Sequence, residues 1–435
     1  MVFHGLIMPK SPDVSMTKYL LFLLLFAGAT AFGEPLYSVD AAIAKGVINA
    51  RASLFNATDQ KHVLDSVRDL DPGLIYATYV GVWGTIRQQD LNSAGQLAAA
   101  LRQRLPRTIL GGGVNESMSL SIAPQTLACG GTLGTRTFDP KSMVIHAGNQ
   151  LGDTVWLDLA NPTARDYYIC VGTMLIDRGY TLIGFPEHEN VIAHASSKPD
   201  AVRNFVSLLR TLRQYGVEKG QQVLFSGDPA TDATVSEIDF YYVPSRFYHL
   251  TFAQKYQNRI SRPGVGVGYS YSLSSARVRD VVSAAPRTAH VFFYVDNWDS
   301  SQDDLRRFME LDGDNRRYLL TASAQTAHKY GAYFILPLLH CVDCIPAKFV
   351  GDHCEIRPDG KTEYDAVTCG DIATLKQGLA EQRWELPEGA GQLNLSSGGR
   401  KRSFDAVRHR QVELAPRSAA QPIPWCNRSC SPRLL

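Results

Sequence analysis

Short apolar runs alternate with longer amphipathic stretches between residues 74 and 339. The runs are rich in β-branched and aromatic residues, as in strands that are buried on both faces of a parallel sheet. They are residues 74–82, 108–110, 155–159, 181–185, 222–226, 238–243, 265–271, 290–295 and 333–339. This pattern predicts strands at these positions.

The stretches between the runs have the signals of helices. Asn161 is a typical N-cap residue, and Pro162 follows it at the first helical position. Residues 200–217 carry apolar side chains at helical spacing. Residues 321–330 are a predicted helix followed by Gly331, and glycine is typical of the position after a helix.

Strands that alternate with helices predict right-handed βαβ units, in a closed (β/α)8 barrel or an open doubly wound sheet. The glycine run 111–113 lacks the spacing of a dinucleotide-binding or phosphate-binding loop, which favours the barrel. We therefore predict an α/β fold, a (β/α)8 TIM-type barrel with a disulfide-rich C-terminal extension. The nine runs are one more than the eight strands of such a barrel. We therefore expect one run to lie outside the barrel as an excursion, at 238–243 or 265–271.

The N-terminus carries the pattern of a secretory signal. Residues 20–32 are an apolar run that is shorter than the roughly 20 residues of a membrane span, Lys18 precedes it, and residues 31–33 resemble a cleavage site. We predict a signal peptide over 1–33, a secreted, extracellular protein, and no stable membrane association after removal of the signal. An uncleaved signal anchor is the alternative.

The eight cysteines indicate disulfides, because an even number is typical of exported chains. Four of them lie between Cys341 and Cys369, where the alternative is a zinc site. We predict a barrel domain over 34–340, a cysteine-rich insert over 341–370 and a basic, flexible tail over 371–435. Four glycosylation sequons predict a glycoprotein, at Asn56, Asn115, Asn394 and Asn427.

Composition is that of a globular protein, with 45% hydrophobic and 20% charged residues. These values exclude a disordered or collagen-like chain. A net charge of +2 gives no overall basic field, so we expect no nucleic-acid partner.

Candidate catalytic residues follow the predicted strands, because parallel barrels carry their sites at the carboxyl ends of strands. Glu187 follows the run 181–185 after a single residue, Pro186, and Asp296 comes directly after the run 290–295. Two carboxyl groups are what glycoside hydrolysis requires. We choose Glu187 as general acid/base and Asp296 as nucleophile or base. The alternatives are that Glu187 caps a helix and that Asp296 accepts hydrogen bonds from loop amides.

Other side chains at the same strand ends are predicted to bind substrate. Aromatic rings can stack on the apolar faces of sugars, and carboxylates can bind sugar hydroxyls. The predicted binding residues are Asp158, Glu189, Tyr269, Trp298 and Trp156. Asp158 has an alternative role in organising a turn. We expect no metal or cofactor, because the histidines near Glu187 lack a metal-binding spacing.

Residues 156–191 resemble poorly characterised secreted glycoside-hydrolase-like barrels. The matching pieces are an aromatic-x-Asp-x-x-Asn-Pro segment at 156–162, Ala-Arg-x-Tyr at 164–167, and the apolar strand before Glu187. The resemblance implies that Glu187 is an active-site carboxyl group. This chain has Pro186 where the related strand ends in Asp.

These observations predict a secreted glycosidase-like hydrolase that acts on a glycan or polysaccharide through a carboxylate pair. The alternative is a catalytically inactive extracellular barrel that binds a glycan or a protein, which Pro186 favours. A metal-dependent phosphodiesterase is a weaker alternative. The expected partner is a carbohydrate.

Overall fold

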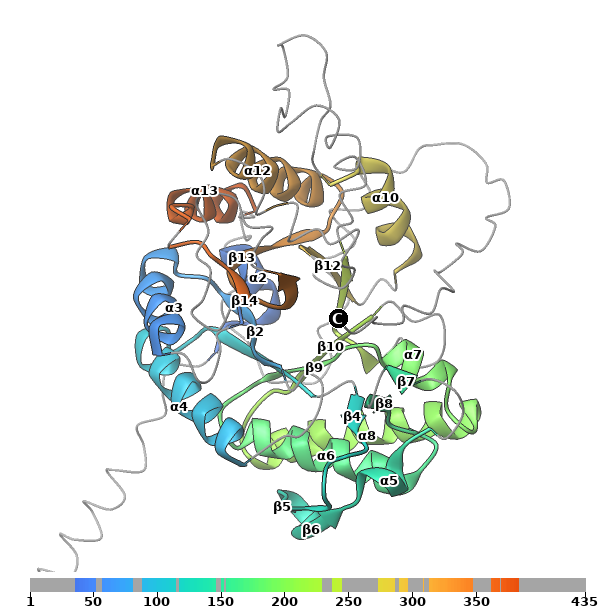
Figure 1. Cartoon of the computed structure of the whole chain (residues 1–435). Helices are drawn as coiled ribbons and strands as arrows, with labels where there is room; N and C mark the ends of the chain where they lie inside the picture. The colour runs from blue at the N-terminus through green and yellow to red at the C-terminus, as the bar shows by residue number, and fades with distance from the viewer. Residues whose placement is uncertain are drawn as a thin grey trace, which may run out of the picture.

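The computed structural model describes residues 36–51, 57–80, 88–114, 117–145, 150–151, 154–228, 237–244, 273–285, 289–295, 308, 313–346, 361–367 and 369–382. Eight parallel strands close into a barrel (Figure 1). In order they are β1 (Val47–Arg51), β2 (Leu74–Val80), β3 (Ile109–Gly113), β9 (Leu182–Phe185), β10 (Leu224–Gly227), β11 (Phe240–Pro244), β12 (His290–Tyr294) and β13 (Tyr333–Pro346). The predicted TIM-type barrel is confirmed.

Two pairings complete the barrel sheet. β1 pairs with β13 in parallel, with Ile48 opposite Leu336, so the first strand meets the last. β14 (Lys361–Asp365) then adds to β13 in antiparallel orientation.

Helices form a ring around the strands (Figure 1). They are α3 (Ala57–Leu70), α4 (Gln88–Arg104), α6 (Pro162–Ile176), α7 (His188–Ala193), α8 (Lys198–Glu218), α10 (Ser275–Ala284), α12 (Gly313–Lys329) and α13 (Ile372–Glu381). Alternation along the strands separates two cores. Residues such as Ile48 and Phe225 pack outward against the helices, whereas Val47 and Leu224 pack inside the barrel.

The inner core is closed at one end by α2 (Val39–Lys45), which precedes β1. Ala42 and Ile43 of this helix pack against the inward side chains of the strands. The helix lies very close to β2, because a Cβ on Gly73 would be 2.0 Å from the carbonyl oxygen of Ala42. Glycine is therefore required at position 73.

The helix signals of the sequence are confirmed. The Asn161 side chain accepts a hydrogen bond from the N–H of Thr163 at 2.9 Å, and Pro162 begins α6. Helix α8 contains residues 200–217. Gly331 follows α12 with φ of +76°, a conformation that favours glycine.

An excursion separates β3 from α6. It contains β4 (Ser117–Ser119), β5 (Gln125–Ala128), a 3-10 turn (Gly131–Leu133), β6 (Thr135–Phe138), α5 (Pro140–Met143), β7 (Gln150–Leu151) and β8 (Thr154–Trp156). These strands form two small antiparallel sheets outside the barrel, β4–β8–β7 and β5–β6.

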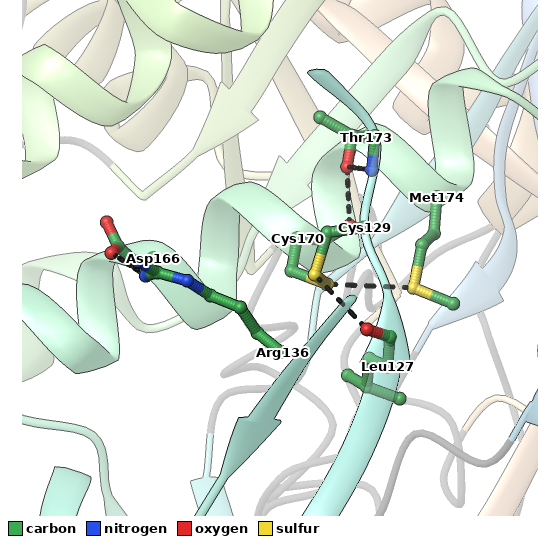
Figure 2. Close-up of a disulfide and its surroundings, with 8 residues drawn as sticks. Leu127, Cys129, Arg136, Asp166, Cys170, Thr173 and Met174 are labelled. Atoms are coloured by element: carbon green, nitrogen blue, oxygen red, sulfur yellow. Dashed lines mark hydrogen bonds and ion pairs between the residues drawn. A yellow bond between two sulfur atoms is a disulfide. The ribbon is translucent and has the colours of Figure 1, made fainter. Parts of the chain in front are cut away.

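A disulfide between Cys129 and Cys170 fastens this excursion to α6 (Figure 2). Beside it, the N–H of Gly130 donates to Oγ1 of Thr173 at 3.0 Å, and Arg136 pairs with Asp166. The excursion is therefore attached to the outer layer of the barrel at several points.

One strand prediction was wrong. Residues 155–159 do not form a barrel strand, because β8 belongs to the antiparallel sheet β4–β8–β7. Of the two places where an excursion was expected, 238–243 is excluded, since β11 is a barrel strand between β10 and β12. The first barrel strand, β1, was not predicted, because Asn49 and Arg51 interrupt its apolar pattern. Residues 265–271 lie outside the described residues.

The packed part of the chain continues past residue 340. β13 extends to Pro346, and α13 buries Leu375 and Leu379 against the barrel. Arg316 of α12 pairs with Asp371 at 2.7 Å, and both side chains are fully buried. The apolar side chains of α13, among them Leu375 and Leu379, were the signal that could have revealed this helix.

Disulfide formation is confirmed for Cys129–Cys170, and Cys369 is disulfide-bonded as well. The predicted signal peptide, the four sequons and residues 383–435 lie outside the described residues. No helix in the described part of the chain is long and apolar enough to cross a membrane.

Candidate functional site

Glu187 lies at the junction between β9 and α7, at the carboxyl end of the fourth barrel strand. Its backbone is left-handed, with φ of +56°, which is uncommon for a residue with a side chain. Its carbonyl oxygen accepts the hydrogen bond of the Val191 N–H at 2.9 Å and so begins α7. The position that the sequence predicts for Glu187, just after an apolar strand, is confirmed.

The environment of Glu187 favours its protonated form. Burial raises the pKa of the Glu187 carboxyl, because a buried carboxylate loses solvation. A hydrogen bond from Nδ2 of Asn190 to Oε2 acts in the opposite direction and is the smaller effect. A carboxyl group with a raised pKa can serve as a proton donor near neutral pH.

His188, the next residue, fastens this junction to the neighbouring strand. Its ring is buried and stacks on Phe205, with centroids 5.0 Å apart. The N–H of Asp228 donates to its Nδ1 at 3.3 Å. A Cβ on Gly227 would be 2.7 Å from the ring, so only glycine allows this approach.

Asp228, which contacts His188, is a second carboxyl-bearing residue at the end of the adjacent strand. Phe185 pairs with Gly227 in the β9–β10 register, so Asp228 follows β10 where Pro186 follows β9. Among the described residues, Asp228 is thus the acid that the barrel register places beside the Glu187 junction.

Glu189 and Asp158 lie close to this junction in the chain or in space. Glu189 is half-buried in the first turn of α7, where a negative charge is favourable. Oδ1 of Asp158 accepts hydrogen bonds from the N–H groups of Ala160 and Ser196, at 3.0 and 3.2 Å. Asp158 thus holds loop backbone in place. Binding of substrate by Glu189 or Asp158 stays a prediction.

Trp156 contacts the far end of α7 rather than the end of a barrel strand. Its ring lies 4.8 Å from that of His194, centroid to centroid, with 34° between the planes. The excursion therefore brings an aromatic side chain to the helix that Glu187 begins.

The remaining predicted site residues, Asp296, Tyr269 and Trp298, lie outside the described residues. β12 ends at Tyr294, two residues before Asp296, and it is the seventh barrel strand. The predicted pairing of Asp296 with Glu187 stays a prediction.

Sequence reasoning missed a group of polar and aromatic side chains inside the barrel. Tyr76 and Tyr242 approach each other from strands β2 and β11, with centroids 5.6 Å apart, and Tyr294 lies 5.6 Å from Tyr242. Asn49 and Ser226 are buried, and no described residue forms a hydrogen bond with Oδ1 of Asn49 or Oγ of Ser226. Alternation along each strand was the signal that could have found them.

A metal site is a separate question. Within the described ranges, no three His, Cys, Asp or Glu side chains are grouped so that they could hold one metal ion.

No family model matches the chain, and no protein of curated function is similar to it in sequence. Solved structures with a similar fold include a trehalulose synthase mutant, 13% identical, with a TM-score of 0.39 over 68% of this chain and 65% of that one. A debranching enzyme from Nostoc punctiforme is 12% identical, with a TM-score of 0.41 over 77% of this chain and 71% of that one.

A trehalose-6-phosphate hydrolase mutant from Bacillus licheniformis is 8% identical, with a TM-score of 0.40 over 68% of this chain and 65% of that one. The chain therefore spans about two thirds of the length of these proteins. The likeness is one of fold.

Proposed function

We propose that this protein is a secreted glycosidase-like hydrolase that acts on a glycan through a carboxyl pair containing Glu187. The observation that carries the proposal is the position of Glu187 at the carboxyl end of a barrel strand, in a buried environment. It follows the fourth strand of the barrel, at the end where such barrels carry their sites, and burial raises its pKa.

In this proposal Glu187 donates its proton to the glycosidic oxygen as the bond to the sugar breaks. A second carboxylate either attacks the sugar or activates a water molecule. Asp296 is the partner that the sequence predicts, and Asp228 is the acid at the end of the neighbouring strand. A distance of roughly 5–5.5 Å between the two carboxyl groups corresponds to retention of configuration at the sugar, and roughly 6.5–9.5 Å corresponds to inversion.

The experiment compares the wild-type chain with Glu187→Gln and Glu218→Gln on a panel of glycans. Gln keeps the acceptor for Asn190 but cannot donate a carboxyl proton. We expect Glu187→Gln to lose turnover without a lower melting temperature. Glu218→Gln is the control, because it neutralises an exposed carboxylate at the end of α8 that has no predicted role in the site. Retained turnover in Glu187→Gln would remove Glu187 from the mechanism.

The partner is identified by the same assay on Asp296→Asn and Asp228→Asn. Loss of turnover in only one of them assigns the second carboxylate. If both variants and Glu187→Gln remain active, the carboxyl-pair mechanism is wrong.

The second candidate is a barrel that binds a glycan or protein outside the cell without hydrolysis. Pro186 in place of an acid at the strand end, and the engagement of Glu187 with Asn190 in its own helix, favour this alternative. Binding on a glycan array, with no cleavage of any bound glycan, would decide for it. Recovery of the chain from the culture medium, with its N-terminus after residue 33, would support secretion.

A further inference from the structure

Helix α7 has one polar, exposed face. Glu187, Asn190 and His194 are separated by three and four residues, so they lie on the same side of the helix. Asn190 and His194 are exposed, whereas Val191 and Ile192 on the opposite side are buried in the core. A ligand that contacts Glu187 and extends along this face would reach His194.

The ring of His194 is held in one orientation at the end of this face. Its Nδ1 lies 2.9 Å from the carbonyl oxygen of Asn190, which can only accept a hydrogen bond. Nδ1 must therefore carry the hydrogen, and Nε2 of the neutral ring is an acceptor. Trp156 packs against the ring from the excursion.

This arrangement leaves Nε2 of His194 available to bind a ligand. No described residue forms a hydrogen bond with Nε2 of His194, and the side chain is exposed. An exposed side chain normally loses rotational freedom on binding a ligand, and fixing it beforehand reduces that cost. The tilted ring contact with Trp156 and the bond to Asn190 supply this preorganisation.

We propose that His194 is a recognition residue for a neighbouring sugar unit, with Nε2 accepting a hydrogen bond from a sugar hydroxyl. The inference rests on the proposed function and names the substrate class as an oligosaccharide or longer glycan. The six residues of α7 separate Glu187 from His194, so the two residues lie about 10 Å apart along the helix axis. A chain of sugars therefore contacts both residues, and a monosaccharide at Glu187 does not reach His194.

This role changes the function expected of Trp156. The sequence predicts that its ring stacks on a sugar, whereas the structure places His194 against it. In the proposal, Trp156 is a positioning residue that orients the histidine.

The test measures sugar binding with the full chain carrying Glu187→Gln, which prevents hydrolysis. The probes are xylo-, cello-, malto-, manno- and chito-oligosaccharides with their monosaccharides, titrated by calorimetry. His194→Phe keeps a ring against Trp156 but removes the acceptor nitrogen. We expect it to weaken oligosaccharide binding about two- to twelvefold, the equivalent of one net hydrogen bond, and to leave monosaccharide binding unchanged.

Two further measurements separate recognition from a structural role. The ¹⁵N resonance of Nε2 should shift when an oligosaccharide binds, and should not shift with the monosaccharide. His328→Phe is the matched control, because Nδ1 of His328 also lies close to a carbonyl oxygen, that of Glu381 at 2.7 Å, on another helix. It should leave oligosaccharide affinity unchanged.

The outcomes distinguish the inference from the proposed function. If His194→Phe binds every oligosaccharide as tightly as its parent, or if no oligosaccharide binds, the inference is wrong. Turnover by the wild-type chain with an unchanged KM in His194→Phe would refute the inference alone. Binding that weakens in His194→Phe, with no hydrolysis by the wild-type chain, would refute the proposed hydrolysis and support recognition.

Discussion

Removal of the Cys129–Cys170 disulfide should destabilise the fold substantially. The two cysteines are separated by 41 residues. The loop-closure relation for a cross-link of this size gives an entropy of about 13 cal/mol/K, or about 4 kcal/mol at 25 °C. We expect the double variant Cys129→Ala, Cys170→Ala to lose about this much free energy of unfolding.

The assay is urea unfolding without reductant, followed by tryptophan fluorescence and by circular dichroism. The free energy at zero denaturant and its slope are compared between the double variant and the wild-type chain. The single variant Cys129→Ala is the control, because it breaks the same bond and leaves Cys170 in its buried position. The hydrogen bond between Gly130 and Thr173 remains in all of these chains.

A loss below about 1 kcal/mol would refute the reasoning, because it would mean that the cross-link hardly restricts the unfolded chain. A much larger loss in the double variant than in the single variant would assign the effect to packing around Cys170 instead.

Three other perturbations test the site and the C-terminal part of the fold. Gly227→Ala should cost about 1–3 kcal/mol of unfolding free energy in urea, because its Cβ would overlap the ring of His188. Glu187→Gln should raise the melting temperature at pH 7 and not at pH 4. Because the folded protein raises the pKa of Glu187, the wild-type fold loses stability as the pH rises above the pKa that Glu187 has in the unfolded chain. Asp371→Ala should cost about 3–5 kcal/mol in urea, because it removes the buried carboxylate that accepts hydrogen bonds from Nε of Arg316 and from the hydroxyl of Tyr364.

The matched controls use neighbouring positions. Gly220→Ala has open space around its Cβ, so only its positive φ opposes the substitution. Glu189→Gln lies in the same helix as Glu187 and should not reproduce its pH dependence. Equal stability of Gly227→Ala and wild type, an equal gain for Glu187→Gln at both pH values, or a loss below about 1 kcal/mol in Asp371→Ala would contradict the respective prediction.

The alternation of strands and helices favoured the barrel correctly, because most of its elements carry their own local signal. Asn161 and Pro162 began a helix where the sequence predicted, and Gly331 ended one. Residues 155–159 were assigned to the barrel because an apolar run does not reveal which sheet it joins. β1 was missed because its inward-facing Asn49 is polar.

The site was predictable only in part. Glu187 was located at a strand end from its apolar neighbours, and the structure confirms that position. The contact between Trp156 and His194 joins strand β8 of the excursion to the end of helix α7, so no local pattern contains it. The inward tyrosines depend on the closure of the barrel, which brings β2 opposite β11.

The helix α2 has a consequence for how molecules reach the interior. Ala42 and Ile43 pack across the end of the barrel where the strands begin, against side chains that fill the first layer of the interior. The described residues therefore cover the end of the barrel where the strands begin. In the proposed function, a glycan would approach from the opposite end, where Glu187 follows β9.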